Sequence, residues 1–342
     1  MFSRARTQSA LTGQDSLSRL FQEVSGGLQS TPRRIPEKLL YDQRGAELFE
    51  EITRLDTYYP TRLEIEILEA CLAEVRELVA PDATVVEFGS GSGRKTMLLL
   101  DSLDRPARCI LVDISETQLL GFAERLQAEY LGVDVLPVVA DYTQPFALPK
   151  TGVGKEGEVG RILFFFPGSS IGNFQPSEAE RFLHRVGRIG GLGSSLLIGV
   201  DCVKERGPLL RAYDDPEGVT AEFNRNALRH LNELFDGDFV ASSFVHRAIW
   251  NAALSRIEMR LVCTAQQDVS LEPAFPDGEP LRIRLEEGEE IVTEHSYKYG
   301  PGQFEALCRS AGWETIRRWT DPRGWFAVHF LERQANGDGT FE

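Results

Sequence analysis

The chain has 342 residues, of which 42% are apolar and 26% are charged, and its formal net charge is -15. This length allows two domains of ordinary size, and the composition is that of a folded globular protein rather than a disordered one. The acidic balance disfavours nucleic acid and anionic membranes as partners, because a negative surface attracts neither phosphates nor anionic headgroups.

The five cysteines are widely spaced and form no C-x-x-C pair: Cys71, Cys109, Cys202, Cys263 and Cys308. An odd, scattered set is typical of reduced thiols in the cytosol. The first residues lack the apolar stretch of a secretory signal, and no window approaches the roughly 18 apolar residues of a membrane span. We therefore expect a cytoplasmic protein, a monomer, whose partners are small molecules rather than nucleic acid or membrane.

The N-terminal part of the chain reads as helices separated by a polar link. Apolar residues at helical spacing predict a helix over 15–29, and "STPRRIPEK" (30–38) follows as the link. Helical spacing returns over 47–52 and 61–79. Pro60 stands between these two stretches and makes one continuous helix unfavourable.

The middle of the chain alternates between strands and helices. Continuous apolar runs predict strands, at 84–88, 109–113, 135–139, 161–166 and 195–200. Helical patterns lie between most of them, at 94–103, 115–130 and 176–188, and the glycine-rich segment 150–160 is expected to be a loop. This alternation predicts an α/β fold with a parallel sheet covered by helices on both faces.

The pattern changes after Asp201. We expect helices over 208–235, strands over 240–263, a long loop over 264–290, and charged strands or a hairpin over 281–298. A last helix over 301–311 and two closing strands would return to the sheet, and the tail 333–342 is expected to fray.

The stretch "VVEFGSGSGRKT" (85–96) predicts a strand that turns on glycines into a helix, a geometry that brings backbone close to a ligand. A phosphate loop would need glycine in place of Arg94, and a dinucleotide fingerprint would need its third glycine at the same position. Glu87 also disfavours a phosphate-rich ligand and favours a cationic one. S-adenosylmethionine fits, and Glu87, Gly89, Ser90 and Gly91 are the candidate contacts.

Acids end the next two predicted strands. Asp113 could accept both ribose hydroxyls of a nucleoside, and Asp141 the exocyclic amine of an adenine beside Tyr142. Each acid alone could equally be a helix cap, but three acids on successive strands favour a nucleoside site. Lys95 could meet the ligand's carboxylate, although a lysine at a helix start is usually solvated.

The fourth strand opens into "FFFPGSSIGNF" (164–174). Gly168 and Asn173 stand where this strand becomes a loop, which is either part of the site or a turn with asparagine in a left-handed conformation. The serines lie outside any G-x-S-x-G motif, so a hydrolase is disfavoured.

Seven stretches between about residues 35 and 330 together resemble the histidine-specific Nα-methyltransferases of ergothioneine biosynthesis, which make hercynine from L-histidine and S-adenosylmethionine. They are "LYDQRGAELFEEITRLDTYYPTR" (40–62), "EFGSGSGRKT" (87–96), "LVDISE" (111–116), "FFPGSSIGNF" (165–174), "VDCVKERGPLLRAYDDPEGVTAEFNRNALRHLN" (200–232), "RIEMRL" (256–261) and "TEHSYKY" (293–299). Within the fifth, "YDDPEGVTAEFNRN" is the most specific.

The resemblance implies a Rossmann-like methyltransferase domain at 63–202 and 299–342. A second, discontinuous α+β substrate-binding domain would comprise 10–62 and 203–298, with the amino acid in a cleft between the two. S-adenosyl-L-methionine would be the co-substrate.

The resemblance also implies a role for each matching position. Asn173, Tyr58 and Tyr213 would hold the α-carboxylate and amino group of the substrate. Tyr41 would lie close to the amine, with the carbonyl of Gly168 facing it and Phe49 as a pocket wall. Glu294 and Ser296 would bond the imidazole, and Met259 would line its pocket. The catalytic set would be Tyr41, Asn173 and Gly168, and the cofactor contacts Gly89, Lys95, Asp113 and Asp141.

A glutamate and a serine two residues apart on one strand face the same side, so Glu294 and Ser296 can both reach one imidazole. An aliphatic side chain would not satisfy a buried carboxylate there, and an indole, with a single N–H and no acceptor nitrogen, would not match both groups as an imidazole does. Without the motif, Glu294 would read as an exposed glutamate of a charged hairpin. Two features depart from the family pattern: Tyr142 replaces the more usual phenylalanine, and the loop 264–290 is longer than usual.

Two other functions stay open. The same fold could methylate the amine of another amino acid, such as a tryptophan derivative, or the chain could be a catalytically inactive protein that binds S-adenosylmethionine. No metal site is expected, because the five histidines show none of the short paired spacings of a zinc site.

Overall fold

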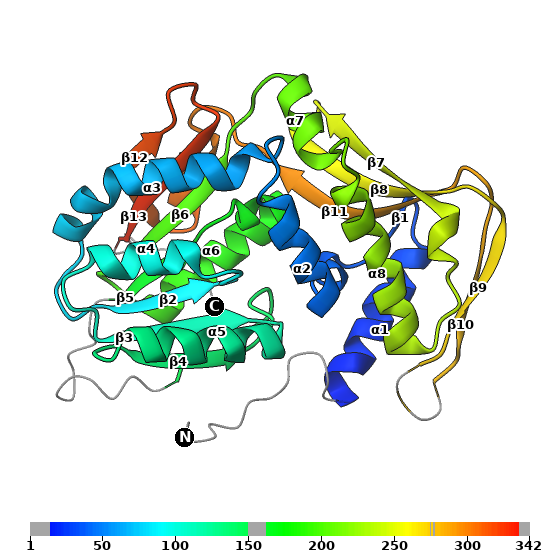
Figure 1. The fold of residues 1–342 in the computed structure, drawn as a ribbon, viewed down its shortest axis with the longest axis horizontal. Coiled ribbons are helices and arrows are strands. Elements are labelled where there is room, and N and C mark those ends of the chain that lie inside the picture. Colours follow the sequence, from blue (N-terminus) through cyan, green and yellow to red (C-terminus); the bar gives the residue numbers. More distant parts are fainter. Residues whose placement is uncertain (1–13, 150–161, 274, 276–277, 335–342) are drawn as a thin grey trace. The chain divides into compact units, whose positions relative to one another are not determined.

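The computed structural model describes residues 14–149, 162–273, 275 and 278–334 (Figure 1). The chain divides into two compact units, and each is described by itself. Unit 1 contains Pro60–Val203 and the described part of Lys298–Glu342, and unit 2 contains the described part of Gln8–Tyr59 together with Lys204–Tyr297. The predicted loop 150–160 and the tail from 335 lie outside the described residues.

Unit 1 is built on a seven-stranded sheet with the order β12-β13-β6-β5-β2-β3-β4. Neighbours among the five strands β2 to β6 are parallel, whereas β13 is antiparallel to both β6 and β12. The strands are β2 (Thr84–Phe88), β3 (Arg108–Asp113), β4 (Asp134–Val139), β5 (Ile162–Phe166), β6 (Ser195–Asp201), β12 (Trp313–Thr320) and β13 (Phe326–Arg333). All five central strands and the two closing strands were predicted from the sequence.

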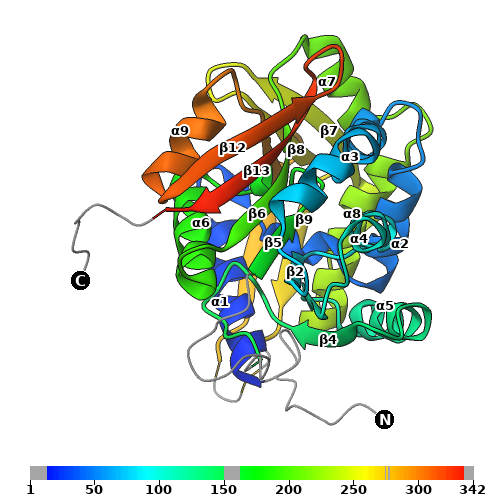
Figure 2. The same cartoon turned by 90° about the vertical axis from the view of Figure 1, so that its left-hand side faces the viewer.

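Helices cover both faces of this sheet, as predicted. In Figure 2, α6 and α9 lie on one side, and α3, α4 and α5 lie on the other. Their bounds are α3 (Tyr59–Leu78), α4 (Arg94–Ser102), α5 (Glu116–Glu129), α6 (Pro176–Gly190) and α9 (Gln303–Ser310). The helix α3 begins next to Pro60, because proline is well tolerated in the first turn of a helix.

The core on the α6 and α9 side is rich in aromatic rings. Phe88 stacks on Phe164 with ring centroids 5.9 Å apart and meets Phe182 of α6 at 5.4 Å. All three side chains are buried. Burial of apolar area stabilises the sheet at roughly 25 cal/mol per Å², so these residues hold the strand ends that carry the candidate site.

Unit 2 contains a four-stranded sheet with the order β1-β11-β8-β7 and a separate antiparallel pair, β9 and β10. The strands are β1 (Arg33–Arg34), β7 (Phe244–Asn251), β8 (Arg256–Cys263), β9 (Gln267–Leu271), β10 (Leu281–Leu285) and β11 (Glu290–Tyr297). The helices are α1 (Gln14–Gln29), α2 (Gln43–Ile52), α7 (Arg206–Tyr213) and α8 (Val219–Phe235), with the short 3-10 turns η1 (Glu37–Leu40) and η3 (Ala241–Ser243).

One expectation for unit 2 was wrong. The segment 264–290 is not a continuous loop, because β9 and β10 pair within it over Gln267–Leu271 and Leu281–Leu285. The strands expected over 281–298 are confirmed as β10 and β11; they form no hairpin with each other, since β10 pairs with β9 and β11 pairs with β8. Alternation along a strand identifies the strand but not its partner, which long-range packing decides.

Unit 1 buries an ion pair at the end of β6. The ammonium of Lys298 lies 2.9 Å from Oδ2 of Asp201, and both side chains have no exposed surface. The amide of Tyr299 also donates to the carbonyl of Asp201 at 3.0 Å. Removing one member of such a pair leaves the other charged and desolvated.

Replacing Lys298 by methionine should therefore lower the free energy of unfolding by about 3–5 kcal/mol, measured by urea denaturation. Arg54→Met is the control, because Arg54 forms an exposed pair with Glu50 and should change the value by less than about 0.5 kcal/mol. A loss below about 1 kcal/mol in Lys298→Met would contradict the importance of the buried pair.

Candidate active site

The turn between β2 and α4 requires glycine at three positions. Gly89, Gly91 and Gly93 have φ angles of 72°, 50° and 78°, in the left-handed region that glycine adopts without strain. A Cβ on Gly93 would lie 1.9 Å from the ring of Phe122. Over Gly91 a Cβ would meet nothing within 4 Å, and over Gly89 only the hydroxyl of Tyr142 at 3.8 Å. The turn is thus open toward a ligand at the carboxyl end of β2.

Glu87 does not present an open carboxylate to this turn. Its side chain is 1% exposed, and Oγ1 of Thr96 donates to its Oε2 at 2.6 Å. Burial raises the pKa of Glu87 to about 8, although Thr96 and Lys95 act in the opposite direction. The carboxyl group is mostly protonated at neutral pH, which weakens the charge argument on which its cofactor role rested. That role stays a prediction.

Asp113 and Asp141 follow neighbouring strands. Asp113 ends β3 opposite Val139 of β4, and Asp141 comes two residues after β4 ends. Burial raises the pKa of Asp113, while the backbone amides of Ser115, Ile114 and Ser90 lower it. The structure therefore brings Asp113 next to the backbone of the glycine turn.

Both acids also stabilise the turns that follow them. Asp113 accepts from the amide of Ser115 at 2.9 Å. Asp141 accepts from the amide of Thr143 at 2.9 Å and from its hydroxyl at 2.5 Å. These are turn contacts rather than helix caps, because the N-cap of α5 is Ser115 and Asp141 lies in a turn that starts no helix. The nucleoside role stays a prediction.

Tyr142 lies beside the glycine turn. Its ring is 5.9 Å from that of Phe88 and 5.7 Å from that of Phe166, between centroids. A Cβ on Gly89 would lie 3.8 Å from its hydroxyl. The aromatic wall predicted for an adenine therefore stands next to the open part of the turn.

Lys95 is paired inside unit 1 rather than solvated. Its Nζ lies 2.6 Å from Oε2 of Glu64, a residue of α3 that the sequence analysis did not assign. The amide of Gly168 donates to the same carboxylate, at 2.9 Å from each oxygen. Glu64 could have been noticed in the sequence, because it is in helical phase with the buried Leu68, Cys71 and Val75.

The loop after β5 carries Gly168 and Asn173 to the same edge of the sheet. Gly168 has a φ of 84°, and the adjoining turn η2 (Ser170–Asn173) ends at the half-buried Asn173. Oγ of Ser169 accepts from the amide of Asp201 at 2.9 Å, which ties the loop to the end of β6. The carboxyl ends of the parallel strands in unit 1 thus carry the predicted cofactor residues. They also carry Gly168 and Asn173.

Unit 2 gathers the remaining predicted residues around one aromatic cluster. Ring centroids join Tyr41 to Phe49 at 5.8 Å, Phe49 to Tyr58 at 6.2 Å, and Tyr58 to Tyr213 at 6.2 Å. Phe223 of α8, which the sequence analysis did not assign, contacts both Tyr41 and Phe49, at 5.5 and 6.0 Å. The hydroxyl of Tyr213 lies 2.8 Å from Oγ of Ser296.

The pairing of β11 with β8 places the expected ring-binding residues on one face. Glu294 lies opposite Met259 and Ser296 opposite Ile257, and all four side chains are buried. The register shifts between Val292 and Glu294, where the hydroxyl of Thr293 donates to the carbonyl of Met259 at 3.1 Å. This bulge keeps Ile291 as well as Glu294 on the buried face of the sheet.

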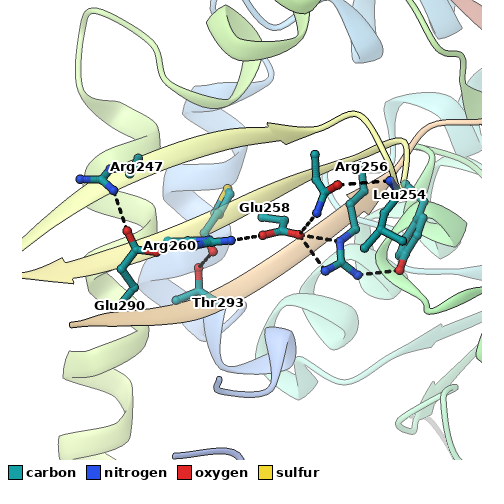
Figure 3. A network of polar contacts seen from close by, with 10 residues as sticks. Arg247, Leu254, Arg256, Glu258, Arg260, Glu290 and Thr293 are labelled. Atoms are coloured by element: carbon teal, nitrogen blue, oxygen red, sulfur yellow. Dashed lines mark hydrogen bonds and ion pairs between the residues drawn. The ribbon is translucent and has the colours of Figure 1, made fainter. Parts of the chain in front are cut away.

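The other face of these strands carries a network of ion pairs (Figure 3). Arg256 and Arg260 flank Glu258 on β8, and Glu290 of β11 joins Arg260 to Arg247 of β7. Burial raises the pKa of Glu258, but Arg260 and Arg256 outweigh it and lower the pKa to about 2. The network fixes the strand pairing directly behind Met259 and Glu294.

Polar residues of the motif "YDDPEGVTAEFNRN" anchor neighbouring parts of unit 2 to α8. Asn226 donates to Oδ1 of Asp42 at 2.6 Å, and Asp42 caps α2 by accepting from the amide of Gly45 at 2.7 Å. Asp42 directly follows Tyr41, so Asn226 fixes the backbone beside the predicted catalytic tyrosine.

Asn224 acts on Tyr213 through His246. Nε2 of His246 lies 2.8 Å from the carbonyl of Tyr213, which can only accept, so Nε2 carries the proton. Burial lowers the pKa of His246, which keeps the ring neutral, and Nδ1 accepts from Asn224 at 2.8 Å. The sequence analysis quoted this motif but assigned no role to Asn224, Asn226 or His246.

No group of three or more His, Cys, Asp or Glu side chains in the described ranges could hold a metal ion. No helix of the described chain is long and apolar enough to span a membrane. All five cysteines are buried and free.

The parallel central strands, the helices on both faces of the sheet and the open glycine turn define a Rossmann-like α/β protein. Residues 20–333 match the family described as "Histidine-specific methyltransferase, SAM-dependent". The chain belongs to this family.

Curated relatives extend over most of the chain. A histidine N-alpha-methyltransferase of Mycobacterium tuberculosis is 41% identical over 90% of this chain and 93% of its own length. One of Mycolicibacterium smegmatis is 38% identical over 94% of this chain and 98% of its own. Among solved structures, an S-adenosylmethionine-dependent methyltransferase of Clostridium acetobutylicum covers 85% of this chain and 98% of its own at 12% identity, with a TM-score of 0.44.

The raised pKa of Glu87 predicts a pH dependence of stability. The folded protein holds this proton more tightly than the unfolded chain, so the stabilisation is complete below about pH 4.5 and is lost as the pH rises through about 8. In Glu87→Gln the loss is absent. Urea denaturation without ligands should therefore show that the free energy of unfolding of the variant, relative to that of the wild type, rises between about pH 4.5 and pH 8. The expected rise is on the order of a few kcal/mol.

Glu69→Gln is the matched control, because Glu69 is an exposed glutamate of α3. Its difference from wild type should stay flat with pH. A flat difference in Glu87→Gln as well would show that Glu87 ionises normally in the folded protein.

Proposed function

We propose that the protein transfers three methyl groups in succession from S-adenosylmethionine to the α-amino group of L-histidine, forming hercynine for ergothioneine biosynthesis. The observation that carries the proposal is the buried face of β8 and β11. There Glu294 lies opposite Met259, with Ser296 bonded to Tyr213. The names of the mycobacterial relatives support the same substrate.

The buried face suits an imidazole because that ring offers two nitrogens in a flat, half-apolar frame. Glu294 would accept from the N–H of one nitrogen, and Ser296 would bond the other. Glu294 is only 8% exposed. A substrate side chain without a donor would forgo this charge-assisted hydrogen bond, at a cost of about 1–3 kcal/mol. Specificity for histidine therefore rests on Glu294.

The backbone groups of the amino acid would be held by the remaining predicted residues. Tyr58, Tyr213 and Asn173 would bind the α-carboxylate and amino group. Tyr41 and the carbonyl of Gly168 would orient the nitrogen, with Phe49 as an apolar wall. The edge contact of Tyr41 with Phe223 restricts its ring and favours a single orientation of its hydroxyl.

On the cofactor side, the open space over Gly89 and Gly91 fits a ligand that approaches the backbone closely. Asp113 would accept the ribose hydroxyls, Asp141 the adenine amine beside Tyr142, and Lys95 the carboxylate of the methionine moiety. Glu87 and Ser90 would line the same turn. S-adenosylmethionine supplies an electrophilic methyl group on its sulfonium.

The protein's contribution to the transfer is mainly alignment. The carbon–sulfur bond breaks as the carbon–nitrogen bond forms in line with it, and a well-oriented pair can gain about 7–11 kcal/mol over a bimolecular reaction. The amine must be neutral, and water or Tyr41 would take its proton. Release of the spent donor and binding of a fresh one would precede each further methylation.

The direct test is to incubate the protein with L-histidine and excess S-adenosylmethionine and to identify the product by mass spectrometry. We expect histidine heavier by three methylene increments, because each methyl group replaces a hydrogen. Nα,Nα-dimethylhistidine should bind and give the same product. A product that stops at one methyl group would contradict trimethylation. Methylation of another amino acid in place of histidine would refute the substrate.

Replacing Glu294 by alanine should weaken histidine binding at least about tenfold in calorimetric titration, since a charge-assisted bond to the ring is lost. The variant should also accept a bulkier aromatic amino acid such as tryptophan more readily in competition assays. Glu287→Ala is the control, because Glu287 is exposed between β10 and β11. Unchanged specificity in Glu294→Ala would rule out its role in reading the ring.

A further inference from the structure

Glu64 is a buried acid in unit 1 that no role assigned above uses. Its side chain is 1% exposed on the apolar side of α3, in helical phase with Leu68 and Cys71. A carboxylate in such a place is costly unless it is paired and hydrogen-bonded. Its partners therefore indicate why an acid stands there.

The carboxylate of Glu64 joins two parts of the candidate site. Oε2 lies 2.6 Å from Nζ of Lys95 in the first turn of α4, and the amide of Gly168 lies 2.9 Å from each oxygen. The side chain of Lys95 is 19% exposed, whereas that of Glu64 is 1% exposed. A Cβ on Gly168 would lie 3.6 Å from the same ammonium.

The surrounding strands leave room for this carboxylate and hold the loop from the other side. A Cβ on Gly199 of β6 would lie 1.9 Å from Oε1 of Glu64, so only glycine fits there without displacing it. The next loop residue, Ser169, is tied to Asp201 through its hydroxyl. Glu64 and Asp201 thus fix the Gly168 loop from two elements.

We propose that Glu64 is a positioning residue for methyl transfer, which holds Lys95 in place for the donor's carboxylate and Gly168 in place for the acceptor's amino group. The inference rests on the roles proposed above for Lys95 and Gly168. A lysine carries its charge on a flexible four-carbon stem, so an anchored ammonium loses less freedom when a ligand binds. Alignment of donor and acceptor is the main contribution to this reaction.

The test compares two ligands that share a nucleoside. S-adenosylhomocysteine carries the amino-acid carboxylate, whereas 5′-methylthioadenosine lacks it. In Glu64→Gln the amide can still accept from Gly168, but it loses the ion pair with Lys95. We expect calorimetric affinity for S-adenosylhomocysteine to fall about tenfold, and that for 5′-methylthioadenosine to change less than about twofold.

The controls separate a positioning role from a structural one. Glu66→Gln, an exposed neighbour on α3, should bind both ligands as wild type does. Lys95→Met should show the same selective loss, and the double variant Glu64→Gln/Lys95→Met no further loss, because both act through one contact. Equal losses for the two ligands, unchanged or tighter binding of S-adenosylhomocysteine, or additive losses would overturn the proposal.

Gly199→Ala gives a second route to the same contact, because it displaces the Glu64 carboxylate without removing it. It should reproduce the selective loss of S-adenosylhomocysteine, and its failure to do so with the fold intact would overturn the proposal. If Lys95→Met binds both ligands normally, the cofactor placement under the proposed function is wrong and the inference falls with it. If Lys95→Met shows the selective loss but Glu64→Gln and Gly199→Ala bind both ligands as wild type does, only the inference about Glu64 is wrong.

Discussion

The cost of burying a polar group without a partner is the constraint on which the candidate site depends. Glu64, Glu87, Asp201 and Glu258 are all buried, and each has a bonded partner. Glu64 pairs with Lys95 and Asp201 with Lys298, which lie far away in the sequence, whereas Glu87 and Glu258 are bonded to nearby residues. Each such bond is directional, so it fixes a distance and an orientation that apolar packing alone leaves loose. The polar contacts therefore decide where the functional side chains point, while the aromatic core supplies most of the stability.

In unit 1 this constraint acts on a parallel sheet that already gathers its loops at one edge. The carboxyl ends of β2, β3, β4 and β5 deliver the glycine turn, Asp113, Asp141 and the Gly168 loop to that edge. The buried Glu64 then joins the Gly168 loop to the start of α4. The chemistry proposed for this edge requires alignment more than acid or base strength, and a fixed set of backbone positions is suited to that requirement.

In unit 2 the candidate site residues are positioned by the alternation of side chains along antiparallel strands. Side chains on successive residues of β8 and β11 point to opposite faces, so one face carries Met259, Glu294 and Ser296 while the other carries the Arg256–Glu258–Arg260 network. The bulge at Thr293 shifts the register of β11, so that Ile291 and Glu294 both lie on the buried face. Asn224 and Asn226 complete the arrangement from α8, which explains why a motif rich in polar residues lies on a buried helix.

The sequence by itself determined the parallel sheet, the helices on both of its faces and the glycine turn, because continuous apolar runs, helical spacing and glycine spacing are local signals. It also determined that Glu294 and Ser296 share a face, since that follows from the two-residue period of a strand. Strand partners were beyond it: the pairing of β9 with β10 and of β11 with β8 depends on contacts between distant residues. Only the tertiary structure paired Lys95 with Glu64, raised the pKa of Glu87 by burying it, and joined His246 to Tyr213. The partner and the solvent exposure of a charged group are properties of the packed chain.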